Sequence, residues 1–278
     1  MSRSRGRAGE WGIPVPGDPT QVVWVWFDAL ANYVTALGYG SADGGAYRTW
    51  WAEADRRAHV VGKDVARFHA VIWPALLLAA GEPAPTAVFV HGFLTVGGRK
   101  LSKSAGADAN PEAVVESLGL DAFRWWLVRD VPRAGDTDFR PELVAARGRE
   151  LAHVVGNLVN RSVALARRVA PAEGDPGHPL ALAAAALPGA VDDALGRFDL
   201  RAASAAIAEL AQEANRHVSE TRPWELPHDE LAEVVPVLLG VCAALGRELE
   251  PFVPGAGARI GEALATRDPA LGRALFAA

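Results

Sequence analysis

Cysteine is almost absent from the sequence: Cys242 is the only one among 278 residues. A lone cysteine excludes an intrachain disulfide and any zinc site built on paired cysteines. The sequence also has no apolar run of membrane-spanning length, because the longest candidate, residues 71–80, is too short and contains Pro74. Residues 1–12 are polar and basic and do not resemble a secretion signal. We therefore expect a globular cytoplasmic protein that has no membrane partner.

Lysine is also scarce. Of the 28 basic residues only Lys63, Lys100 and Lys103 are lysines, and all three lie between positions 63 and 103. An ammonium group is a compact charge on a flexible stem and suits contact with phosphate. The net charge of −5 means that any contact with nucleic acid must be local, since the chain as a whole repels phosphate.

The first 140 residues mix strand and helix patterns. Apolar runs predict strands at 22–29, 59–62 and 87–96. Residues 65–79 between the last two carry apolar side chains at helical spacing, with Pro74 placed to kink that helix. Strand, helix and strand in this order form the smallest parallel crossover unit.

Strand patterns disappear after residue 141, where only helical periodicity continues. The predicted helices are separated by clusters of proline and glycine, and they cover residues 142–169, 180–196, 200–220, 230–249 and 255–265. We predict an α/β domain over residues 1–140 and an all-α helix bundle over residues 141–278.

The sequence GGRKLSKS at residues 97–104 follows a predicted strand and a Gly-Gly turn. Ligands bind at the carboxyl ends of strands in parallel α/β sheets. Two lysines with serines between them at such a strand end would neutralise a triphosphate. An exposed basic loop explains the same spacing equally well, so both interpretations stay open at this point.

Several segments together resemble one enzyme family. KLSKS at 100–104 is similar to the Lys-Met-Ser-Lys-Ser signature of class I aminoacyl-tRNA synthetases, and the surrounding sequence resembles methionyl-tRNA synthetases. The matching segments, in family order, are WGIPVPGDP (11–19), VWFDALANYVTALGY (25–39), HVVGKDVARFHAVIWPALL (59–77), FVHGFLTVGGRKLSKS (89–104), GLDAFRWWL (119–127), DTDF (136–139), GNLVNR (156–161), ANRHV (214–218) and RPW (222–224).

The resemblance implies a methionine pocket. A thioether is soft and apolar and packs well on aromatic edges, which agrees with the aromatic members of this set. Taken alone, His69 is also explained as a core histidine and Asp64 as a helix N-cap. Leu30 stands where some family members have proline. The implied pocket residues are Trp26, Ala29, Leu30, Tyr33, Asp64, Phe68 and His69.

The resemblance also implies an ATP site, with Mg²⁺ as the counter-ion of the nucleotide and no metal bound by the protein itself. Lys100, Ser102 and Lys103 are the implied catalytic residues, because they would contact the phosphates while the adenylate forms. Taken alone, Lys63 is equally explained as a solvated charge at a strand end. The implied ATP-binding residues are Gly62, Lys63, His91, Gly92, Lys100 and Lys103.

In the predicted bundle, the resemblance assigns reading of the tRNA anticodon to Asn157, Arg161 and Trp224. Asn157 and Arg161 are four residues apart and share one helix face, and Trp224 follows a proline at a helix end. Unpaired RNA bases stack on such aromatic rings. A solvated polar face and a core aromatic ring are the alternatives.

One family signature is missing from these 278 residues. No two of the seven histidines are three residues apart with a glycine between them, so the His-x-Gly-His signature is absent. The resemblance therefore covers only the second half of a Rossmann-type nucleotide-binding sheet and the anticodon-binding bundle. We expect a chain of these residues to be inactive alone, with the strands near His59 and Ala87 left without neighbours.

Three origins stay open: a fragment of a longer gene, which we favour, one half of a split enzyme with a separate N-terminal catalytic fragment, or a repurposed paralogue. The predicted function is ATP-dependent activation of methionine and its transfer to methionine tRNA. The alternatives are a tRNA-binding module and an amino-acid-activating paralogue outside translation.

Overall fold

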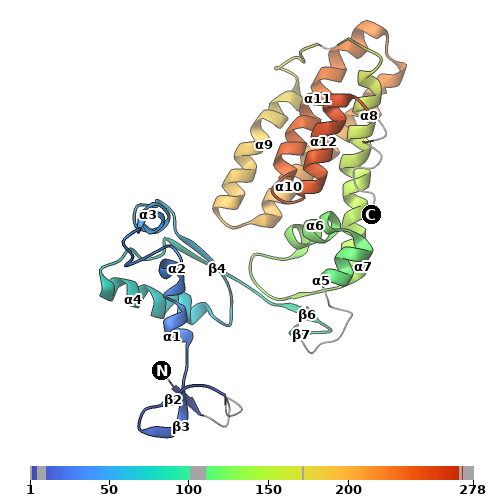
Figure 1. Ribbon diagram of the computed structural model, residues 1–278. Coiled ribbons are helices and arrows are strands. Elements are labelled where there is room, and N and C mark those ends of the chain that lie inside the picture. The colour runs from blue at the N-terminus through green and yellow to red at the C-terminus, as the bar shows by residue number, and fades with distance from the viewer. Residues whose placement is uncertain (1, 5–10, 101–110, 171, 269–270, 272–278) are drawn as a thin grey trace. The chain divides into compact units, whose positions relative to one another are not determined.

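The computed structural model describes residues 2–4, 11–100, 111–170, 172–268 and 271. The described chain is mostly helical with small sheets (Figure 1). It forms two compact units, Met1–His91 and Gly92–Ala278. None of the helices in the described residues is both long and apolar enough to cross a membrane.

The first unit begins with an antiparallel sheet. Its strands β1 (Ser2–Ser4), β2 (Pro14–Val15) and β3 (Asp18–Val23) lie in the order β1-β3-β2. The chain then turns into two short helices, α1 (Trp26–Ala29) and α2 (Asn32–Thr35).

The predicted strand over residues 22–29 is therefore wrong beyond Val23. Leu30 and Val34 are four residues apart, and both are buried in a small core with Trp51 and Trp73. Helical spacing of these core contacts overrides the strand preference of the preceding aromatic run.

The predicted strand–helix–strand unit is confirmed. After α3 (Gly45–Tyr47) and η2 (Arg48–Ala52), strands β4 (Ala58–Gly62) and β5 (Ala87–His91) pair in parallel, with Ala58 opposite Ala87 and Gly62 opposite His91. The connection between them contains a π-helical turn, η3 (Phe68–Ile72), and helix α4 (Trp73–Ala80).

Pro74 explains the π turn. A proline has no N–H, and its ring collides with the carbonyl four residues earlier, here that of Ala70. The chain widens the preceding turn, so the N–H of Trp73 bonds the carbonyl of Phe68 five residues back. Helix α4 then starts with Pro74 in its first turn, where a missing N–H costs little. The predicted kink takes this form.

Hydrogen bonds join the chain at both ends of the β4–β5 pair. At the amino end of β4, the Arg57 N–H donates to Thr86 Oγ1 at 2.8 Å and Arg57 Nε donates to the Ala84 carbonyl at 3.1 Å. Arg57 Nη1 donates to the carbonyls of Trp51 and Ala54. At the other end, the Lys63 N–H donates to the His91 carbonyl at 3.1 Å.

The second unit opens where the predicted strand over residues 87–96 divides. A Cβ at Gly92 would lie 1.7 Å from the Gly135 carbonyl oxygen, so only glycine permits this backbone approach. Strand β6 (Leu94–Val96) then pairs with β7 (Arg99–Lys100) and β8 (Thr137–Asp138) in a separate sheet of order β7-β6-β8.

The predicted Gly-Gly turn joins β6 to β7. Gly97 and Gly98 have φ values of 56° and 74°. Two successive positive φ angles are typical of the tight turn that matches the twist of a two-stranded hairpin.

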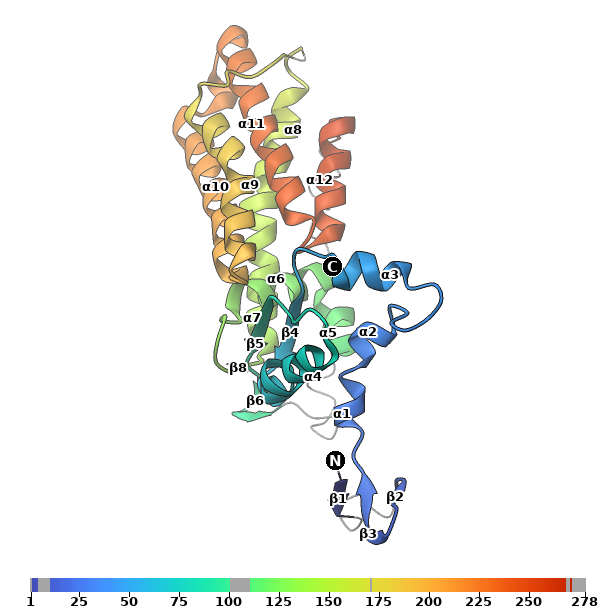
Figure 2. The same cartoon turned by 90° about the vertical axis from the view of Figure 1, so that its left-hand side faces the viewer.

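From residue 141 onward the described chain is helical, as the apolar periodicity predicts (Figure 2). Neighbouring helices pack along their lengths, with α9 against α10 and α11 in contact with α8, α9 and α12. The helical elements of the second unit are α5 (Pro111–Leu118), α6 (Leu120–Asp130), α7 (Pro141–Leu151), η5 (Ala152–Gly156), α8 (Asn157–Ala166), α9 (Pro179–Gly196), α10 (Leu200–Thr221), η6 (Pro223–Glu225), α11 (His228–Leu249) and α12 (Pro254–Thr266).

The bundle core consists mainly of branched aliphatic side chains and alanines, such as Val163, Ile207 and Leu238. Trp125 of α6 belongs to the same core and is 1% exposed. A helix that precedes residue 140 therefore contributes a large side chain to the bundle. The predicted functional domains over residues 1–140 and 141–278 stay a prediction, and the compact units divide earlier, after His91.

Candidate functional site

Tyr33 and His69 form the polar centre of the predicted methionine pocket. The two side chains come from α2 and η3, and Tyr33 Oη lies 2.9 Å from His69 Nε2. His69 Nδ1 lies 3.0 Å from the carbonyl oxygen of Val65, which can only accept a hydrogen bond. In the neutral ring Nδ1 therefore carries the proton, Nε2 accepts, and the Tyr33 hydroxyl donates.

The rings of Trp24 and Trp26, which lie before and in α1, pack against the ring of Phe68, the first residue of η3. The ring of Trp26 lies 5.0 Å from that of Phe68 and 5.4 Å from that of Trp24, measured between centroids. The Trp24 and Phe68 rings meet edge to face at 5.8 Å. Trp26 is 39% exposed, so this cluster presents an aromatic surface that a thioether can contact.

The other predicted pocket residues lie on the same elements. Leu30 follows α1 and is buried in the core on which Phe68 packs. Ala29 ends α1 and is exposed. Asp64 is exposed on the turn between β4 and η3. The structure thus places all seven predicted residues on α1, α2 and the segment that follows β4.

His59 is a residue that the sequence reasoning missed. Its ring lies 4.3 Å from that of Tyr33, tilted by 56°, and 5.7 Å from that of His69, measured between centroids. Burial, and secondarily the neighbouring His69, lowers the pKa of His59. Its Nε2 is buried and makes no hydrogen bond within the described chain. The single polar residue inside the apolar strand 59–62 was the available signal.

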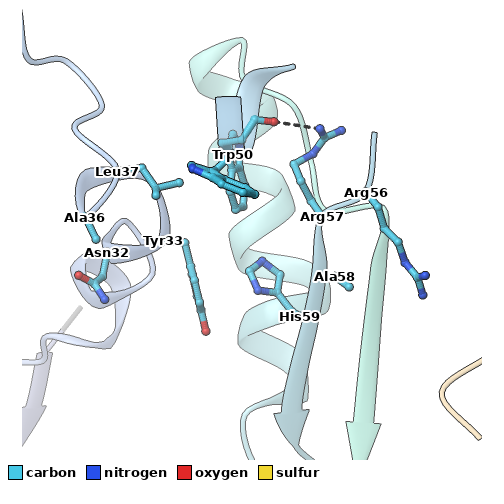
Figure 3. Close-up of a pocket in the computed structure, with 10 residues that line it drawn as sticks. Asn32, Tyr33, Ala36, Leu37, Trp50, Arg56, Arg57, Ala58 and His59 are labelled. Atoms are coloured by element: carbon cyan, nitrogen blue, oxygen red, sulfur yellow. Dashed lines mark hydrogen bonds between the residues drawn. The ribbon is translucent and has the colours of Figure 1, made fainter. Parts of the chain in front are cut away.

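A cavity of about 420 Å³ opens at the amino end of β4 (Figure 3). Tyr33 from α2 and His59 from β4 face each other among its lining residues, and Trp50 and Arg57 lie above them in this view. Tyr33 is the only predicted methionine residue that lines it. The cavity therefore lies behind the Tyr33 ring, at the strand end opposite to Gly62.

The predicted nucleotide residues Gly62, Lys63 and His91 meet at the carboxyl ends of β4 and β5. Gly62 stands opposite His91 in the strand register, and the Lys63 N–H bonds the His91 carbonyl. Ligands bind at this edge of parallel sheets, and the assignment of these residues to ATP stays a prediction. Gly92 follows directly and begins the second unit.

The predicted phosphate loop is described only at its start. Lys100 ends β7, and its Nζ lies 3.7 Å from the centroid of the Phe93 ring. This cation–π contact holds the ammonium on the hairpin. Ser102 and Lys103 lie outside the described residues. Among the described residues, no three histidine, cysteine or acidic side chains gather closely enough to hold a metal ion.

In the helical unit, Asn157 and Arg161 are both exposed, one turn apart on α8. Between them Leu158 and Val159 are fully buried, which fixes the polar pair on the outer face of the bundle.

Trp224 is 46% exposed on η6. Its carbonyl accepts a hydrogen bond from Arg168 Nη1 at 3.3 Å, so η6 lies near the residues that follow the carboxyl end of α8. Within the described part of the chain, no hydrogen bond or ring contact links Trp224 to Asn157 or Arg161.

A family profile described as "tRNA synthetases class I (M)" matches residues 2–163. The chain belongs to this family. The match includes both the aromatic pocket in the first unit and the polar pair on α8, so it joins the two candidate sites in one family.

Curated relatives agree with this assignment. The chain is 41% identical over 229 residues to the methionine–tRNA ligase of Halalkalibacterium halodurans, an alignment that covers 79% of this chain and 34% of that protein. It is 38% identical over 269 residues to the methionine–tRNA ligase of Mesorhizobium japonicum, covering 92% and 51%. The chain thus spans between about a third and a half of the length of these relatives.

Solved structures show the same fold. Methionyl-tRNA synthetase of Mycobacterium tuberculosis bound by methionyl-adenylate superposes with a TM-score of 0.78 at 32% identity, covering 94% of this chain and 53% of that one. The ligand-free form of that enzyme gives a TM-score of 0.73 at 30% identity.

Proposed function

We propose that this chain forms the methionine pocket, the phosphate loop and the anticodon-binding bundle of a methionine–tRNA ligase. The observation that carries the proposal is the hydrogen-bonded pair Tyr33–His69, set beside the Trp24–Trp26–Phe68 cluster in a class I synthetase of the methionine type. The relatives that support it are named as methionine–tRNA ligases, and one solved structure is bound by methionyl-adenylate.

In the proposed reaction, the carboxylate of methionine attacks the α-phosphorus of ATP and displaces pyrophosphate, which leaves methionyl-adenylate. A ribose hydroxyl of the tRNA then attacks the carbonyl carbon of the adenylate and displaces AMP. The aromatic cluster would hold the methyl and methylene groups of methionine. A partly buried hydroxyl–imidazole pair, whose hydrogen-bonding groups already bond each other, would favour the thioether sulfur over a side chain with a stronger hydrogen-bonding demand.

The charged steps need cations. Lys100 and Lys103 would lie against the phosphates of ATP and stabilise charge as pyrophosphate leaves. Mg²⁺ would accompany the nucleotide, and its phosphates would supply most of the ligands. Gly62, Lys63 and His91 would approach the nucleotide with backbone and side chain at the carboxyl edge of β4 and β5.

The two units have separate proposed roles. We propose that β4 and β5 belong to the second half of a Rossmann-type sheet, and that the bundle binds the anticodon through Asn157, Arg161 and Trp224. A polypeptide that carries a His-x-Gly-His signature would complete the sheet and the ATP site, either joined to this chain or as a separate fragment.

The decisive experiment adds the missing signature in trans. The N-terminal part of the Mesorhizobium japonicum ligase that this chain does not match is purified and mixed with the 278-residue protein. Methionine-dependent ATP–pyrophosphate exchange is expected only from the mixture, and Lys103→Ala in this chain should abolish it. Strong exchange by the 278 residues alone would contradict the need for the signature.

A tRNA titration separates ligase from binding module. Preferential binding of methionine tRNA over a transcript with an altered anticodon, together with exchange by the mixture, supports the ligase. Preferential binding without exchange, after the mixture is shown to associate, would instead support a tRNA-binding module. Exchange without any preference for the anticodon would support the amino-acid-activating paralogue.

A further inference from the structure

The helix that carries Asn157 and Arg161 is interrupted directly before them. The π turn η5 lies between α7 and α8, and the N–H of Asn157 bonds the carbonyl of Ala152 five residues back. A π turn takes up one more residue than an α turn. Each residue of an α-helix turns the chain by about 100°, so the π turn decides which side chains of α8 face outward.

Asn215 of α10 reaches this turn from a neighbouring helix. Its Nδ2 donates to the carbonyl of Val154, in the middle of η5, at 2.7 Å, and to the carbonyl of Ala211 on its own helix at 2.8 Å. The two hydrogens of one amide group are thereby divided between the two helices. The bond to Val154 spans 61 positions of sequence and is partly buried, so it is a tertiary contact.

The surroundings hold the amide in place. Ala211 and Ala214, on the turn of α10 that carries Asn215, are fully buried, and α10 packs directly on η5. Close helix packing with small side chains leaves the amide little freedom to turn away. The family-like segment ANRHV contains Asn215, and neither the methionine pocket nor the phosphate loop uses it.

We propose that Asn215 is a positioning residue for RNA recognition: its hydrogen bond to Val154 maintains the π turn and so keeps Asn157 and Arg161 directed toward unpaired anticodon bases. This inference rests on the proposed function. Asn215 itself touches no base in the proposal, since it lies behind the recognition face.

The test uses a variant that keeps the shape of the side chain. Asn215→Asp has nearly the same volume, but an ionised carboxylate cannot donate to the Val154 carbonyl. The matched control is Ser219→Ala, one turn further along α10, which removes the bond from the Ser219 hydroxyl to the Asn215 carbonyl and leaves the amide in place. Both are made in the 278-residue protein.

The first readout is the ratio of dissociation constants for methionine tRNA and for the same tRNA with an altered anticodon. Asn215→Asp should reduce this preference about tenfold, and Ser219→Ala should change it less than about twofold. In the Arg161→Ala background, Asn215→Asp should have almost no further effect, because it acts through the same face. Equal effects in both backgrounds would overturn the proposal.

The second readout does not use RNA. Hydrogen exchange of the backbone amides in residues 152–161 should become faster in Asn215→Asp and stay unchanged in Ser219→Ala. Unchanged exchange in Asn215→Asp would overturn the proposal whatever the tRNA result. If exchange accelerates but the unsubstituted protein shows no preference for the anticodon, the proposed function fails, and the role of Asn215 in recognition fails with it.

Discussion

In the helical unit, side chains such as Val163, Ile207 and Leu238 are fully buried, and one continuous core joins α6 to α12. In residues 1–91, Trp11 is 85% exposed and Trp50 is 69% exposed, and the core that α2, η2 and α4 share is small. Apolar burial is the main source of folding free energy. The two units must therefore be stabilised in different ways.

The first unit relies on polar contacts between loops. The Arg57 side chain donates to the carbonyl of Trp51, before β4, and to that of Ala84, before β5. The Tyr47 hydroxyl donates to the Glu82 carboxylate. Burial, and secondarily that carboxylate, raises the pKa of Tyr47, which keeps the hydroxyl protonated as the donor. The proposed methionine pocket lies in the unit with less apolar burial. The proposed anticodon-binding residues lie in the unit with more.

The largest expected difference comes from removing one tryptophan from each unit. Trp125→Ala should destabilise the helical unit by about 3–5 kcal/mol, because it leaves a large cavity in a continuous core. Trp51→Ala should lower only the unfolding temperature of residues 1–91. Differential scanning calorimetry should resolve these as separate shifts. One shared shift for both variants would show that the two units unfold together.

Gly92→Ala should have the next largest effect. A Cβ at this position meets the Gly135 backbone, which must move, at a cost of about 1–3 kcal/mol. The matched control is Gly240→Ala within α11, where a Cβ meets nothing within 4 Å and helix propensity predicts a gain of about 0.5–1 kcal/mol. Urea unfolding measures both. A neutral Gly92→Ala would contradict the close approach of the backbones at Gly92 and Gly135.

Tyr33→Phe should weaken methionine binding by about 1 kcal/mol, roughly fivefold, since His69 Nε2 loses its donor while the tilted ring contact with His59 is kept. Isothermal titration with methionine, in the mixture that contains the N-terminal part of the relative, measures it. Tyr39→Phe serves as the control because Tyr39 lies outside the aromatic pocket. Equal losses in both variants would remove Tyr33 from the binding site.

Lowering the pH should modestly reduce the free energy of unfolding of both units. Burial lowers the pKa of His59 in the first unit and, with a contribution from His178, that of His217 in the second. The unfolded chain then binds protons first as the pH falls below about 6.5, so the free energy of unfolding decreases from there toward the lower pKa of the folded state. Melting temperatures at pH 7.5 and 5.5 measure this, and His217→Leu should reduce the decrease for the helical unit alone.

Sequence periodicity predicted the helical unit well because its apolar spacing extends over long helices bounded by proline and glycine. It failed beyond Val23, where aromatic residues with strand preference fold into helix α1 because Leu30 and Val34 reach a core built by distant residues. The division at Gly92 was also missed, since its cause is the backbone of Gly135, 43 positions away.

The methionine pocket stays a prediction from the family resemblance, and the structure adds contacts that the resemblance did not give. It assigns the proton of His69 through the Val65 carbonyl, adds His59 behind Tyr33, and connects Asn215 to the turn before Asn157. These are pairings of distant positions, which no local pattern encodes. Ser102 and Lys103, outside the described residues, stay predictions from the resemblance.

The contacts at the two ends of the crossover have a consequence for local unfolding. Arg57 bonds Thr86 just before β4 and β5 begin, and Lys63 bonds His91 where the two strands end. The two strands are therefore linked to each other at both ends. A two-stranded sheet is weak on its own. Because both ends are linked, neither strand can fray from one end alone. The β4–β5 pair is therefore expected to unfold locally as one cooperative unit.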